Sequence, residues 1–139
     1  MSYELEAEAI FNTHRPRKTT LVDSVLAYVQ TRIARNILSR DLEKFEAGQV
    51  EIKYPDAYIK RLRRSLALIT KDLHDMRTFF KRENVRVTDE PVEVSESSIM
   101  YDYWIKGRTG KCGASSHVMR KDVKRYVQYY LTERVENDG

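Results

Sequence analysis

An apolar seam in the middle of the chain constrains its fold more than any other feature. Seven large apolar side chains recur at alternating steps of three and four residues: Ile59, Leu62, Leu66, Ile69, Leu73, Met76 and Phe80. This spacing places them along one face of a single long helix. The seam covers only about three heptads, and Tyr58, Leu68 and Phe79 widen it. It therefore favours a core helix of a bundle over a free dimeric coiled coil.

Local signals mark the ends of this helix and of a helix before it. Pro55 suits a first helical position, and Asn84 tolerates the left-handed conformation that often ends a helix. The earlier helix is predicted to begin at Thr20, whose hydroxyl caps free amides while Asp23 completes a capping box. Gly48 is its expected end.

The apolar residues of the earlier helix do not share one face. One stripe consists of Val22, Leu26, Val29, Ile33 and Ile37. At 100° per residue, Leu38, Leu42 and Phe45 fall nearly on the opposite side. Two interpretations stay open: either the helix kinks or restarts near Ser39, or its two halves face different partners.

The hydrophobic period changes from 3.6 to 2 after Asn84, which predicts short antiparallel strands. Apolar and polar residues alternate over residues 85–94, around a turn at residues 89–91, and again over residues 99–105. A chain reversal is expected over residues 107–110.

A last helix is predicted to start near Ser115 or Ser116, whose hydroxyls suit an amino-terminal cap, and to end near Glu133. Its buried face is expected to hold Met119, Val123, Tyr126, Val127 and Tyr130.

Together these elements predict one α+β domain over residues 19–135 that is mostly helical. Two long antiparallel helices are followed by a small antiparallel β-sheet and a C-terminal helix. Residues 1–18 are expected to form a flexible N-terminal arm, and residues 136–139 a disordered tail. A chain of 139 residues is long enough to bury a core without disulfides or metals.

Composition narrows the class of protein. The single cysteine excludes an internal disulfide and suits a reducing compartment, so a cytoplasmic location is expected. Glu4, Glu6 and Glu8 stand where a secretory signal needs an apolar core. No apolar run approaches the roughly 18 residues of a membrane span, so no membrane partner is expected.

The sequence shows no catalytic or metal-binding pattern. His14, His74 and His117 lie far apart, and Cys112 has no catalytic partner that spacing identifies. We therefore expect a protein without enzymatic activity, metal, cofactor or small-molecule substrate.

The glycine-rich stretch at residues 107–116 is the best anion-binding candidate. Its glycines let the backbone turn inward, and the helix expected to begin at Ser115 or Ser116 would present free amides to a phosphate. Arg108 and Lys111 add positive charge. The stretch is not a P-loop, because Ile105 replaces the first glycine and Cys112 the magnesium-binding hydroxyl. The structural alternative is a hairpin turn that leads into a capped helix.

Two further segments combine positive charge with features that suit phosphates or bases. The first is a basic run on the long helix: Lys60, Arg61, Arg63 and Arg64. The second groups cations and aromatic rings near the carboxyl end: Lys121, Lys124, Arg125 and Tyr129, with Trp104 on the preceding strand. The alternative for the basic run is an ordinary solvated helix face.

Two functions fit these patterns. The first is a small adaptor or regulatory protein that binds another protein or a second copy of itself. It would use four apolar residues outside the expected core faces: Leu38, Leu42, Phe45 and Leu68. The alternative is a nucleic-acid-binding accessory protein that uses the basic helix and the glycine-rich stretch. Residues 49–84 carry nine basic against five acidic side chains, and residues 105–139 eight against four.

Overall fold

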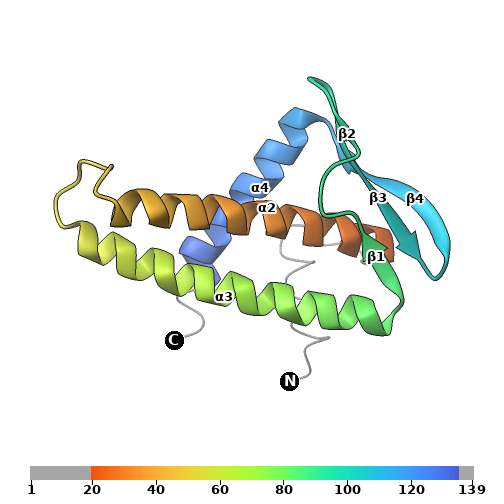
Figure 1. Cartoon of the computed structure of the whole chain (residues 1–139), viewed down its shortest axis with the longest axis horizontal. Helices are drawn as coiled ribbons and strands as arrows, with labels where there is room; N and C mark the ends of the chain where they lie inside the picture. The colour runs from red at the N-terminus through yellow and green to blue at the C-terminus, as the bar shows by residue number, and fades with distance from the viewer. Residues whose placement is uncertain (1–19, 135–139) are drawn as a thin grey trace.

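The computed structural model describes residues 20–134. The expected arm at residues 1–18 and the expected tail at residues 136–139 lie outside these residues. Within the described part, three helices and a four-stranded antiparallel sheet form the fold (Figure 1). The predicted fold class, α+β and mostly helical, is confirmed.

The helices form a layered bundle. Helices α2 (Leu21–Glu46) and α3 (Pro55–Arg82) run antiparallel, and α4 (Ser116–Leu131) crosses them obliquely (Figure 1). The sheet lies at the end of the bundle where α2 begins and α3 ends (Figure 1). Helix α2 contacts both other helices and the sheet, so it is the central element of the fold.

The start of α2 follows the predicted capping box. The Thr20 hydroxyl accepts a hydrogen bond from the Asp23 amide at 3.1 Å, and the Thr20 amide donates to the Asp23 carboxylate at 3.3 Å. The helix then continues through Ser39 to Glu46 without interruption. The interpretation with a restart near Ser39 is therefore wrong, and the uninterrupted helix contacts both other helices and the sheet.

Burial of α2 departs from the predicted stripe. Val22, expected to be buried, is 39% exposed. The small residues Ala27, Thr31 and Ala34 are buried instead. Small side chains let neighbouring helices approach closely, which a helix covered on several sides requires. An apolar stripe cannot reveal such a helix, because its contacts do not lie on a single face.

Helix α3 follows the prediction closely. It begins at Pro55, and Asn84 adopts a left-handed conformation with φ of 54° just after its end. Five seam residues are buried: Leu62, Ile69, Leu73, Met76 and Phe80. The seam therefore packs inside this chain, as expected for a core helix.

Two of the four proposed interface residues belong to the core. Leu38 is completely buried and Leu68 is 7% exposed, so their expected position outside the core is wrong. Helix α4 packs against both α2 and α3, so it covers helix faces that two helices alone would leave open. Leu42 and Phe45 are half-buried, and the Phe45 ring stacks on the Tyr58 ring with centroids 6.0 Å apart.

The sheet is organised around strand β3 (Ile99–Ile105). Strands β1 (Val85–Val87) and β2 (Glu93–Val94) pair with opposite ends of one edge of β3. Strand β4 (Arg108–Ala114) pairs with the other edge along its full length. The predicted alternation after Asn84 is thus confirmed as antiparallel strands.

Strand β4 replaces the loop expected from the glycine-rich stretch. The reversal is the two-residue turn Lys106 and Gly107, both with positive φ, which matches the twist of a tight hairpin. Gly110 then lies against the side chain of Tyr103: a Cβ atom at Gly110 would come within 2.4 Å of that ring. This glycine serves strand packing, which its sequence signal as a loop former does not reveal.

Helix α4 begins and packs as predicted. Ser115 caps it by accepting a hydrogen bond from the Val118 amide at 3.2 Å. Met119, Val123, Tyr126 and Tyr130 are buried, and Val127 is half-buried.

A buried ionic cluster joins α4 to α3. Asp72 on α3 is 1% exposed and accepts a 2.7 Å hydrogen bond from the Tyr130 hydroxyl. The Arg134 guanidinium donates two hydrogen bonds to the same carboxylate, both at 3.2 Å. Burial and the nearby Asp72 carboxylate raise the pKa of Tyr130 well above 10, so its hydroxyl remains a donor. The cluster closes the bundle by satisfying a buried charge.

Candidate functional site

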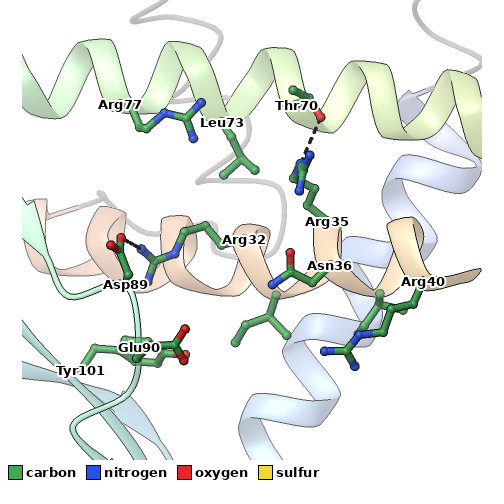
Figure 2. A pocket seen from close by; sticks show the side chains of 12 residues that line it. Arg32, Arg35, Asn36, Arg40, Thr70, Leu73, Arg77, Asp89, Glu90 and Tyr101 are labelled. Atoms are coloured by element: carbon green, nitrogen blue, oxygen red, sulfur yellow. Dashed lines mark hydrogen bonds and ion pairs between the residues drawn. The ribbon is translucent and has the colours of Figure 1, made fainter.

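A cavity of about 560 Å³ opens between α2, α3 and the connection from β1 to β2. Four arginines line it, together with polar and acidic groups (Figure 2). Arg77 extends from α3, and Asp89 and Glu90 come from the connection between the strands (Figure 2). The lining therefore combines residues from three distant parts of the sequence.

One face of α2 supplies most of the cavity's polar lining. Arg32, Arg35, Asn36 and Arg40 all contribute to the cavity. Their spacing of three, four and eight residues from Arg32 places them on the same side of a helix. The opposite sides of α2 are buried, so this face is fixed in orientation by the core.

Arg32 is held firmly in the wall of the cavity. Its guanidinium donates a 2.8 Å hydrogen bond to the Thr88 carbonyl and lies 3.5 Å from the Asp89 carboxylate. It also lies 5.1 Å from the centroid of the Tyr28 ring and 5.7 Å from that of Tyr101. Burial raises the pKa of Tyr101, while Arg32 partly opposes that rise. Arg32 thus brings a fixed positive charge to the cavity.

The other arginines are less constrained. Arg35 donates a 3.2 Å hydrogen bond to the Thr70 hydroxyl across the gap between α2 and α3 (Figure 2). The exposed side chains of Arg40 and Arg77 make no hydrogen bond or ion pair with any other residue in 20–134. Their charges are available to an external anion.

Two more cavities extend the first toward the sheet. A second, of about 510 Å³, shares Arg32, Arg77 and Asp89 with the first and adds Lys81 and Arg86. A third, of about 300 Å³, shares Asn84 and Arg86 with the second and reaches Trp104. Shared lining residues show that the three cavities adjoin.

We call the first two cavities together the arginine groove. Six cationic side chains line it: Arg32, Arg35, Arg40, Arg77, Lys81 and Arg86. Among the lining residues in 20–134, only Asp89 and Glu90 are acidic, which leaves an excess of four positive charges. A concave surface lined by one sign of charge concentrates ions of the opposite sign. The arginine groove therefore suits an extended anion.

The predicted basic run on α3 lies elsewhere. Its residues occupy the half of α3 far from the sheet (Figure 1). Arg61 donates a 2.6 Å hydrogen bond to the Leu131 carbonyl, and Arg63 forms a 2.6 Å ion pair with Glu46. Lys60 and Arg64 are exposed. The run thus spreads over several helix faces, two of which turn toward neighbouring helices.

The glycine-rich stretch does not form the predicted anion-binding loop, because most of it is strand β4. Arg108 and Lys111 are exposed on that strand. The Ser115 hydroxyl is engaged as the cap of α4, and the buried Ser116 donates a 2.9 Å hydrogen bond to the Ser95 carbonyl. Strand β4 and the basic run lie at opposite ends of the bundle, so they do not form one surface (Figure 1).

The predicted group near the carboxyl end is only partly brought together. Lys121, Lys124 and Arg125 are exposed on α4. Tyr129 is half-buried with its ring edge-to-face against Tyr130, 5.1 Å between centroids, and burial raises its pKa. Trp104 is 39% exposed at the end of the arginine groove, and it is the predicted aromatic residue that the structure joins to a cationic surface.

Sequence reasoning missed most of the arginine groove. A signal existed on the first helix, where Arg32, Arg35 and Arg40 recur on one face. It was overlooked because the charges of residues 1–48 balance, with seven basic and seven acidic side chains. No local signal connects these arginines with Arg77 and Arg86, which only the tertiary fold places beside them.

An apolar groove adjoins the cavity on the side of α4. It measures about 280 Å³ and shares Ile33 and Ile37 with the arginine-lined cavity. Met119, Val123 and Val127 complete its apolar lining, while Arg120 and Lys124 contribute cations.

Residues 20–134 contain no cluster of three or more histidine, cysteine or acidic side chains that would hold a metal ion. Cys112 is buried, and burial raises its pKa to about 11. Within the same residues, no helix has the length and apolar character needed to cross a membrane.

The fold and site define a small helical α+β protein with a cationic groove between two helices and a sheet. Residues 18–135 match the family model described as YhjD protein, so the chain belongs to that family. No curated protein and no solved structure matches the chain.

Proposed function

We propose that this protein binds nucleic acid along the arginine groove. The observation that carries the proposal is the excess of four positive charges in one continuous depression, where Arg40 and Arg77 have no partner among residues 20–134. Phosphates are recognised by such arginines through charge and bidentate hydrogen bonds. The role is that of a non-enzymatic accessory protein.

Two contrasts support the groove over the other basic surfaces. Arg61 and Arg63 of the basic run are occupied by intramolecular contacts. Lys121, Lys124 and Arg125 all lie on the single helix α4, and Arg125 is 4.0 Å from Asp122. A concave site surrounds a phosphate chain with several cations, which a single helix face does not.

Binding of a fluorescently labelled single-stranded oligonucleotide, followed by anisotropy over a salt series, tests the proposal. The variant R40A/R77A removes two charges from the groove. Counterion release predicts a log-log salt slope smaller by about 1.4, and hence an affinity about 20-fold lower at 0.1 M salt. The matched variant K60A/R64A removes two charges from the basic run and should leave binding nearly unchanged. Equal losses in both variants, or no binding by the unmodified protein at low salt, would contradict the proposal.

A second candidate function is protein binding, with a second copy of the chain as the partner we test. The apolar groove between α2 and α4 favours it, because half-buried Ile33, Ile37 and Val127 would gain from further burial. Half-buried Leu42 remains a further candidate contact. Light scattering over a concentration series should detect a dimer, and V127E should shift it toward monomer. A monomer at every concentration would remove self-association.

A further inference from the structure

The third cavity, at the end of the arginine groove, differs from the rest in its lining. Four residues line its roughly 300 Å³: Asn84, Arg86, Trp104 and Gly107. Within residues 20–134, nothing lies within 4 Å of where a Cβ atom of Gly107 would stand, so the turn at Gly107 is open on the side of that position. An aromatic ring with a cation next to it is a different kind of surface from the arginine-lined cavities.

The sheet register explains why these groups share one surface. Trp104 on β3 is paired with Arg86 on β1 and with Thr109 on β4. Residues paired across strands project from the same face of a sheet. The neighbouring positions Tyr103 and Ile105 lie on the other face and pack against the core. Trp104 is therefore fixed on the outer face between two strands, with Arg86 beside it.

Trp104 faces polar side chains across the neighbouring strands. Its two cross-strand neighbours are an arginine and a threonine, and its side chain remains 39% exposed. A partly exposed indole that lines a cavity at the end of a cationic groove matches the combination by which proteins hold single strands: cations along the phosphates and rings against the bases.

We propose that Trp104 stacks on an unpaired nucleobase while Arg86 contacts an adjacent phosphate, so that the protein selects single-stranded over duplex nucleic acid. This inference rests on the proposed function of the arginine groove. In a duplex, neighbouring base pairs cover both faces of each base, whereas an unpaired base exposes a face to an aromatic ring. The indole therefore has a ligand only in a single strand.

Trp104 is the only tryptophan in the chain, so its fluorescence reports on this position alone. The full chain is titrated with an oligothymidylate, with a duplex of equal length, and with inorganic polyphosphate as a polyanion without bases. Stacking predicts quenching by the oligothymidylate and little change with the duplex or polyphosphate. Anisotropy of the labelled strands measures binding separately from quenching.

Variants of the aromatic residue complete the test. W104A should weaken oligothymidylate binding about tenfold, the effect expected for loss of one stacked base, and leave polyphosphate binding unchanged. W104F should lose less affinity for oligothymidylate than W104A, because a phenyl ring still stacks on a base. The control Y58A removes an aromatic side chain that is 49% exposed at the far end of the bundle, and its affinity should not change.

The outcomes separate this inference from the function on which it rests. Oligothymidylate binding without quenching, together with normal affinity of W104A, would overturn base stacking and leave the groove as a phosphate site. Equal quenching by polyphosphate would also overturn it. Failure of every polyanion to bind would overturn the proposed function as well.

Discussion

Arginine has two opposite roles in this protein, at Arg134 and in the arginine groove. Arg134 is paired through two hydrogen bonds with a carboxylate that is 1% exposed, and its own side chain is only 17% exposed. Arg40 and Arg77 extend into an open cavity and have no partner among residues 20–134. The same side chain thus closes the bundle at one place and keeps its charge available at another.

The difference shows how local surroundings decide what a charge contributes. A buried ion pair is costly to break, because removal of one partner leaves the other charge without water or a counterion. An exposed arginine is already solvated, so its removal hardly affects folding but weakens attraction to an external anion. Stability and binding should therefore separate when the two sites are altered.

The largest effect is expected from D72A. This change removes the acceptor of the Tyr130 hydroxyl and the carboxylate that carries the charge opposite the mostly buried Arg134 guanidinium. We expect the free energy of unfolding to fall by about 3 kcal/mol, measured by urea denaturation with circular dichroism. D75A, on the same helix, should cost less than about 1 kcal/mol. Similar losses in the two variants would show that the cluster does not stabilise the bundle.

A smaller effect is expected from Y130F, which removes one hydrogen bond to Asp72. The free energy of unfolding should fall by about 1 to 2 kcal/mol at neutral pH. The pKa of Tyr130 is raised in the folded state, so above pH 10 the unfolded chain loses this proton while the folded protein keeps it. Stability of the unmodified protein should thus decline as pH rises above 10. Y130F should show a shallower decline over the same range, measured by urea denaturation at each pH.

The variant D89N is expected to bind nucleic acid more tightly than the unmodified protein. The Asp89 carboxylate lies 3.5 Å from Arg32 and is fully exposed, so it competes weakly with a bound phosphate. Its neutralisation should raise nucleic-acid affinity by up to about fivefold, the size of an exposed ion pair. E96Q makes the same charge change outside the groove and serves as the control in anisotropy titrations. Reduced affinity of D89N would mean that Asp89 positions Arg32 for binding.

The smallest effect is expected on the folding stability of a variant without the two exposed groove arginines. R40A/R77A should change the free energy of unfolding by less than about 0.5 kcal/mol per site, because both side chains are exposed and unpaired among residues 20–134. Urea denaturation of the double variant beside D72A measures the contrast. A loss near that of D72A would assign these arginines a structural role.

Local patterns were sufficient for the three helices and for the strands up to Ile105. The seam of α3, the Thr20 capping box, Pro55 and the alternation after Asn84 predicted helices and strands that the structure confirms. Strand β4 was missed because its glycines resemble a loop, whereas Gly110 is needed where the backbone meets the Tyr103 side chain. Such packing requirements involve a second strand and have no signature within the stretch itself.

By itself the sequence determined where the helices and all strands except β4 form, because capping, turn formation and hydrophobic period act between residues close in the chain. Only the tertiary structure decided which side chains stay exposed and which of them lie together on the surface. It placed Leu38 and Leu68 in the core and separated the basic run from strand β4. It also brought Arg40 and Arg77, distant in sequence, into one groove. Packing of α2 against three neighbours decides which residues are buried and which come together. The periodicity of one segment cannot predict which of its faces a distant segment will cover.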